Sequence, residues 1–150
     1  MIQRIQSLYL VLTTLVSILF LSSGFITFSD NSGTVINFTL AGISGVSEPL
    51  MKTLPVTLLI IIIPVLSSIT IFLFKNRRVQ LILCKLLLTL ISAFITALVI
   101  YSYMVISRYN VELMPGIKMS VPVIQLILVV LAYRGIKKDD NLVKSYDRLR

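Results

Sequence analysis

Four uncharged stretches constrain the fold of this chain more than any other feature of its sequence. Counted between charged residues, these stretches are 25, 22, 22 and 15 residues long, at 5–29, 53–74, 86–107 and 119–133. A helix that crosses a membrane needs about 20 apolar residues, each adding 1.5 Å, so the first three stretches are long enough. The fourth is long enough if the helix begins earlier and the Lys118 side chain extends to the interface.

The overall composition indicates that lipid is the solvent for much of this surface. Hydrophobic residues make up 57% of the 150 residues, and the mean hydropathy is +0.98. Soluble domains contain roughly 45–50% apolar residues, and one domain of this length has too small an interior to bury the excess. The sequence predicts an all-α membrane protein, a bundle of four transmembrane helices at about 8–28, 54–74, 83–106 and 115–134.

The distribution of Lys and Arg predicts the orientation of the chain. With four crossings, both ends and the turn around residues 75–85 share one side, which collects 11 of the 14 cations. The other side carries three cations and three acids, so its net charge is zero. If the last segment did not cross, six more cations would lie outside and the usual positive-inside bias would be inverted. We therefore expect a membrane protein that crosses the bilayer four times and keeps both termini in the cytoplasm.

The cations of the inner side are expected to contact the membrane surface and its anionic headgroups. Basic residues flank the hydrophobic segments and do not form a face with interleaved aromatic residues, so a nucleic-acid partner is not expected. The expected contact residues are Arg4, Lys75, Arg77, Arg78, Lys85, Lys137, Lys138, Lys144, Arg148 and Arg150.

An alternative interpretation of the first segment is a secretory signal peptide. Ser22 and Gly24 form a small-x-small cleavage pattern after an apolar core. The apolar run continues past that pattern through Phe28, and cleavage would place the two cation-rich ends on opposite sides of the membrane. A first membrane span is therefore the preferred interpretation.

The loop and the tail carry two further predictions. In the extracytoplasmic loop, 29–53, two runs rich in β-branched and aromatic residues flank the turn-forming sequence SDNSG, which predicts a β-hairpin. In the cytoplasmic tail, 135–150, apolar residues recur at helical spacing after the possible N-caps Asp139 and Asp140. We expect a short amphipathic helix on the inner membrane surface, with a solvated tail as the alternative.

Three features of the spans suggest how the helices pack. Gln125 is the one strongly polar side chain of the fourth span, and it predicts an interhelical hydrogen bond more than a transport path. Pro64 should bend the second span, with Ser67 and Ser68 compensating the freed carbonyls. A stripe of small side chains marks the third span as the packing centre of the bundle. The stripe consists of Thr89, Ser92, Ala93, Thr96 and Ala97.

No catalytic, cofactor-binding or metal-binding residue is expected. The chain has no His and a single cysteine, Cys84, which excludes an intrachain disulfide, a CxxC redox pair and a Cys/His zinc cluster. Cys84 is expected to fill space near the inner interface. The alternative interpretation is a palmitoylated or reactive thiol. Glu48 and Glu112 lie in separate loops and are expected to balance lysines rather than to form an acid–base pair.

The two ends of the chain carry a resemblance to a known family. MIQRIQSLYLVL at 1–12 and NLVKSYDRLR at 141–150, bracketing four spans, resemble an uncharacterised family of small integral membrane proteins of Bacteroidota, a domain of unknown function. The resemblance implies a bacterial inner-membrane location. It implies no activity, ligand or catalytic residue.

Three function classes remain for a chain with these features. The first is a non-enzymatic accessory or assembly subunit that contacts anionic lipid and a partner membrane protein, or associates with itself. The second is a small oligomeric transporter or channel, which usually needs an acidic residue within a span, and this chain has none in its four uncharged stretches. The third, an enzyme of lipid or envelope chemistry, needs its acids clustered around a cavity. The first class is expected.

Overall fold

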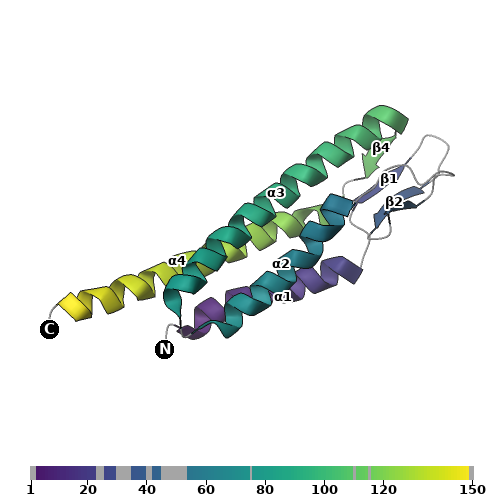
Figure 1. Ribbon diagram of the computed structural model, residues 1–150. Helices are drawn as coiled ribbons and strands as arrows, with labels where there is room; N and C mark the ends of the chain where they lie inside the picture. Colours follow the sequence, from purple (N-terminus) through teal and green to yellow (C-terminus); the bar gives the residue numbers. More distant parts are fainter. Residues whose placement is uncertain are drawn as a thin grey trace.

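The fold consists of four long helices with a small sheet at one end (Figure 1). The structure is a computed structural model, and it describes residues 3–22, 26–29, 35–39, 42–44, 54–74, 76–109, 111–114 and 116–148. The helices are α1 (Gln3–Ser22), α2 (Leu54–Phe72), α3 (Arg77–Tyr109), the short 3-10 helix η1 (Ile117–Ser120) and α4 (Val121–Arg148). The strands are β1 (Ile26–Ser29), β2 (Val35–Thr39), β3 (Gly42–Ser44) and β4 (Glu112–Met114).

Successive helices run in opposite directions, and each of them packs against two others. α1 contacts α2 and α4, while α3 contacts the same two helices from the other side. α1 begins and α4 ends at one end of the molecule, and the sheet lies at the other (Figure 1). The short connection from α2 to α3 is at the end without the sheet, as expected for antiparallel neighbours joined by a tight turn.

The helices bury side chains at alternating spacings of three and four residues. On α1 the buried side chains are Gln6, Leu10, Thr13, Ser17 and Phe20. On α3 they are Gln80, Cys84, Leu87, Ile91, Phe94 and Leu98. α2 and α4 repeat this spacing from Val56 and Gln125 onward. Such a seven-residue period keeps one seam of each helix facing its neighbours, as in left-handed bundles.

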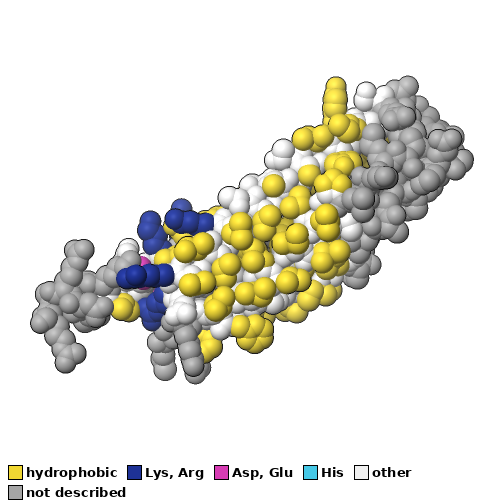
Figure 2. Space-filling model, viewed as in Figure 1, with side chains coloured by type: hydrophobic (Ala, Val, Ile, Leu, Met, Phe, Trp, Pro, Cys, Tyr) yellow, Lys and Arg dark blue, Asp and Glu magenta, His cyan; other side chains and the backbone are white. Residues whose placement is uncertain are grey.

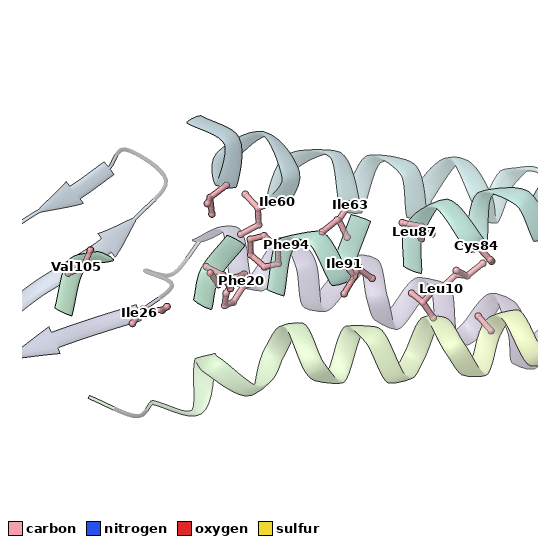
Figure 3. Packing of buried hydrophobic residues seen from close by; sticks show 14 of the residues in the cluster. Leu10, Phe20, Ile26, Ile60, Ile63, Cys84, Leu87, Ile91, Phe94 and Val105 are labelled. Carbon is pink, nitrogen blue, oxygen red and sulfur yellow. The ribbon is translucent and has the colours of Figure 1, made fainter. Parts of the chain in front are cut away.

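Aromatic and aliphatic side chains fill the seam near the middle of the bundle. Phe20 of α1 and Phe94 of α3 meet edge to face, with ring centroids 6.1 Å apart and planes at 88°. Ile60 and Ile63 come down from α2, and Ile91 comes from α3 (Figure 3). An aromatic pair in this geometry adds about 0.5–1.5 kcal/mol beyond the area that it buries.

The outer surface of the helices is apolar over most of their length (Figure 2). Three stretches are long and apolar enough to cross a membrane: Pro55–Phe72, Arg77–Ser107 and Ile117–Val143, and α1 contains the shorter apolar stretch Ile5–Leu21. Large side chains such as Leu19 and Phe72 are 68% and 80% exposed. The chain is thus mostly helical, as predicted, and its apolar exposed surfaces are compatible with a membrane protein.

The ends of the helices differ from the expected spans. α1 ends at Ser22, whereas the expected span continued to residue 28, because Ile26–Ser29 pairs as a strand. α3 extends beyond the expected 83–106 at both ends. α4 shows the largest difference, because it runs without interruption to Arg148. The tail is therefore helical, as expected, but the prediction of a separate helix is wrong, because the tail continues α4.

Asp139 and Asp140 do not cap a new helix. Both lie inside α4, and their side chains are only 7% and 8% exposed. α4 also continues through Gly135, which precedes them. The absence of a side chain at this position makes room for α1. A β-carbon at Gly135 would lie 2.7 Å from Cγ of Gln6, so the two helices approach closely at this point.

The predicted β-hairpin is confirmed, and it belongs to a larger sheet. β1 and β2 are antiparallel, with Ile26 opposite Phe38 and Ser29 opposite Val35, on either side of the turn-forming segment. The sheet has four strands in the order β3-β2-β1-β4. β4 follows α3, so the sheet joins the connection between α1 and α2 to the connection between α3 and α4.

We predict that Gly135→Val destabilises the bundle by about 1–3 kcal/mol, because it forces α1 and α4 apart in a packed seam. The helix propensity gained on replacing glycine is below 1 kcal/mol and does not offset this cost. Unfolding in a detergent titration, followed by circular dichroism, measures the change.

Gly116→Val is the matched control, because nothing lies within 4 Å of a β-carbon at Gly116. Its stability should stay within about 0.5 kcal/mol of the parent, as for surface substitutions. Equal destabilisation by both substitutions would contradict the close contact between α1 and α4.

Candidate functional site

Polar side chains inside the bundle are the first candidates for a site, and those in the middle are bonded to one another. Gln125 of α4 is 2% exposed and donates from Nε2 to Oγ of Ser17 on α1, at 3.0 Å. Ser17 in turn donates to the carbonyl oxygen of Thr13 at 2.7 Å. This confirms the expected interhelical bond of Gln125, which holds α4 against α1.

A second polar contact joins α1 to α2. Oγ1 of Thr14 lies 3.1 Å from Oγ of Ser67, and both hydroxyls reach the carbonyl oxygen of Leu10. Ser68 donates instead to the carbonyl oxygen of Pro64. Pro64 has no N–H, so the carbonyl oxygen of Ile60 lacks its usual donor one turn ahead. Neither Ser67 nor Ser68 donates to that oxygen. Ser67 thus serves a contact between helices and not the repair that the sequence predicted.

The end of the bundle opposite the sheet holds further polar contacts. Gln80 of α3 donates to the carbonyl oxygen of Thr70 on α2 at 3.3 Å. Nη1 of Arg77 donates to the carbonyl oxygen of Asp139 at 3.1 Å, which ties α3 to α4. Gln6 is buried, and its Nε2 has no hydrogen-bond partner in the structure. Each interface between neighbouring helices thus contains a polar contact. The buried amide of Gln6 lies where α1 approaches α4.

These polar groups do not resemble a proton or ion path. The acids of the chain all lie outside its four uncharged stretches. Among the described residues, no group of three or more His, Cys, Asp or Glu side chains could hold a metal ion. Hydroxyl and amide groups that bond across helices chiefly hold the helices together. Each such hydrogen bond stabilises the packing of membrane helices by about 0.6 kcal/mol on average.

Lysine and arginine side chains collect at the end opposite the sheet (Figure 2). The described members are Arg77, Arg78, Lys85, Arg134, Lys137 and Lys138, all exposed except Arg77, which is half-buried. We call this set the basic end. The expected contacts Lys75 and Arg150 lie outside the described residues, and so do the side chains of Arg4, Lys144 and Arg148.

Two hollows lie on the surface of the basic end. One, of about 510 Å³, is lined by Arg134, Lys137 and Lys138 together with Asn141 and Leu142. The other, of about 630 Å³, is lined by Asn76, Arg77, Arg78, Val79 and Val143. Cations beside short apolar side chains suit an anionic group at a membrane surface, because the phosphate pairs with the cations while carbon contacts carbon.

The small-residue stripe on α3 is not where this chain packs its own helices. Thr89, Ser92, Ala93 and Thr96 are exposed, and Ala97 is half-buried. The hydroxyls of the stripe bond to backbone carbonyls one turn back in α3. The buried seam of α3 is built from larger side chains, so the stripe is not the packing centre of the bundle. Small size permits close approach but does not determine which face of a helix is covered.

The single cysteine lies inside the bundle. Cys84 has no exposed surface and packs in the seam of α3 near Leu87 (Figure 3). A buried thiol of this kind acts as a small hydrophobic side chain. The structure therefore supports the space-filling interpretation over a reactive or acylated thiol.

Of the two loop acids, Glu112 lies among the described residues. Glu112 lies in β4, exposed, opposite Ser29 of β1. Glu48 lies outside the described residues. The expectation that they balance lysines stays a prediction.

The fold is a bundle of long helices, three of them apolar enough to cross a membrane, and polar groups in its interior bond helix to helix. Residues 2–149 match the family described as a domain of unknown function (DUF4293), and the chain belongs to that family. The expectation of an uncharacterised family is thereby confirmed. No curated protein and no solved structure matches the chain.

We predict that Gln125 and Ser17 are energetically coupled. In a double-mutant cycle of Gln125→Leu and Ser17→Ala, the coupling energy should be about 0.6 kcal/mol and at most about 1.7 kcal/mol, as for hydrogen bonds between membrane helices. Detergent unfolding of the four proteins measures it.

The control pair is Gln125→Leu with Ser68→Ala, since Ser68 bonds only within α2. Its coupling should be near zero. A Gln125–Ser17 coupling as small as that of the control would show that the bond contributes nothing to stability.

Proposed function

We propose that this chain is a bacterial inner-membrane protein that crosses the bilayer four times, keeps both termini in the cytoplasm, and acts as a non-enzymatic accessory or assembly subunit. The expected source, Bacteroidota, rests on the resemblance of the two chain ends. The observation that carries the proposal is the gathering of exposed cations at one end of an otherwise apolar helical surface.

Helix length supports a fourth crossing. α1 has 20 residues and is therefore about 30 Å long, which equals the thickness of a typical hydrocarbon core. α1 also lies alongside α2 and α4, which are apolar enough to cross. A crossing by α1 returns both ends of the chain to the basic end, which the positive-inside rule assigns to the cytoplasm.

The polar interior supports a binding role over transport or catalysis. Gln125, Ser17 and Ser67 are engaged in bonds between helices, so they have little capacity left for a substrate or an ion. The surface then carries the function. At the basic end, cation-lined hollows are open to anionic lipid and to an acidic segment of a partner membrane protein. The alternative function, a small oligomeric transporter, needs a water-filled path that the bonded interior does not favour.

Photo-crosslinking at the basic end tests this proposal. A photoreactive residue at Asn141, which lines one hollow without contributing charge, should crosslink to a defined partner protein in native membranes. Replacing Arg134, Lys137 and Lys138 by Gln should lower the crosslink yield at least about tenfold, because each cation near an anionic surface contributes about 1 kcal/mol.

Lys118→Gln is the matched control, because it removes one exposed cation at the sheet end. Its crosslink yield should equal that of the parent chain. Crosslinks to lipid alone, or a partner yield that the triple substitution leaves unchanged, would contradict the proposed subunit role.

A further inference from the structure

An apolar cavity of about 340 Å³ lies between α3 and the start of α4, next to the sheet. Phe20 of α1 and Ile26 of β1 contribute to its wall from other elements, and α3 lines it from Ile95 to Ile106. Leu113 of β4 and Pro122 of α4 belong to the wall as well. The lining is almost entirely hydrocarbon, and it comes from α1, β1, α3, β4, η1 and α4.

The chemistry of this cavity selects an apolar occupant. A water molecule needs two to four polar partners, and this lining offers few beyond Ser102 and Tyr103. Apolar cavities of about 150 Å³ already stay dry and take up hydrocarbon ligands. The volume here falls in the range of about 300–1,000 Å³ that is typical of sites for small ligands.

The position of the cavity points to the lipid as the source of that occupant. Val99 of α3 is 64% exposed and Val123 of α4 is 49% exposed, and both line the cavity, so it opens on the apolar outer surface. The lining of α3 extends over eleven residue steps, from Ile95 to Ile106, or about 17 Å. That length is close to half of a hydrocarbon core of about 30 Å, which is the depth of one leaflet.

A described cation lies beside the cavity. Lys118 is exposed in η1 and directly precedes Met119, which lines the cavity. An ammonium group at the interface complements the phosphate of a lipid whose chain enters the apolar space below. A phospholipid therefore matches both the carbon lining and the adjacent charge, whereas a quinone or another neutral lipid matches only the lining.

We propose that this cavity is a binding site for one phospholipid of the leaflet next to the sheet, with an acyl chain between α3 and α4 and the phosphate near Lys118. In the proposed orientation this is the outer leaflet. The site requires the helices to lie in a membrane, but it requires neither the proposed partner nor the proposed direction of insertion. The two proposals can therefore fail separately.

Native mass spectrometry of the purified full chain, titrated with dioleoyl phosphatidylglycerol in nonionic detergent, tests the site. The parent should retain one phospholipid well above the level of further, weakly bound lipids. Val99→Phe fills the opening of the cavity, and it should weaken the first binding step roughly tenfold, because the phenyl ring takes the space that the acyl chain would enter. Lys118→Gln should weaken it roughly twofold to fivefold, the effect of one exposed ion pair.

Ile100→Phe is the matched control, because Ile100 is exposed on the same helix and does not line the cavity. It should change the first binding step less than twofold. Circular dichroism and gel filtration establish that each variant is folded. Val123→Phe and Ile124→Phe form a second pair on α4 with the same expectation, should Val99→Phe fail to fold.

Three outcomes would overturn the site. Equal weakening by Val99→Phe and Ile100→Phe would mean that lipid binds the general apolar surface. Retention of a quinone or another neutral lipid by the purified parent in place of phospholipid would assign a different occupant. A Lys118→Gln variant that binds as tightly as the parent would remove the phosphate contact on which the choice of phospholipid depends.

Discussion

A polar side chain surrounded by hydrocarbon must find its hydrogen-bond partner inside the protein, and the rest of this structure depends on that constraint. The apolar side chains of this chain do not distinguish its interior from its exterior, because Leu19 faces outward and Leu10 faces inward on the same helix. On α1 the polar side chains make the distinction, whereas Thr89, Ser92 and Thr96 of α3 are exposed. Ser17, Ser67 and Gln125 all lie in the buried seam, where each bonds across to another helix.

The same helices connect two ends of opposite character. At one end, the seam contains Gln80 and Asp139, and exposed cations surround it. At the other, a sheet built from two separate connections closes the bundle beside an apolar cavity. Exposed residues such as Lys137 at one end and Val99 at the other can be altered without touching the seam, because their side chains lie on the outer surface. This arrangement is compatible with the proposed accessory role, in which the surfaces bind and the interior holds the helices together.

Much of this arrangement follows from the sequence. The apolar stretches predict the helical membrane class, the turn-forming SDNSG with its flanks predicts the β1–β2 hairpin, and the isolated Gln125 predicts its bond between helices. β4 escaped prediction because a strand of three residues carries no periodicity of its own and is defined by its pairing with β1. The exposed stripe around Ser92 was misassigned because the same small side chains fit both lipid and a packed helix.

The continuous α4 was missed for a different physical reason. Asp139 and Asp140 are typical N-caps and so predicted the start of a new helix, whereas both lie inside α4. The close approach of α1 shows that Gly135 is needed there for packing. The polar seam itself had a signal in the sequence. Gln6, Thr13 and Ser17 follow the spacing of seven and four residues that marks one helix face, and on α1 that face is the buried one.

The central claim is that the basic end faces the cytoplasm after an even number of crossings, and reporter fusions test it most directly. A fluorescent protein that folds only in the cytoplasm, fused after Arg150, should be bright, and the same reporter fused after Met114 at the sheet end should be dark. A phosphatase that is active only outside should give the reverse pattern. Phosphatase activity from the fusion after Arg150 would contradict the account.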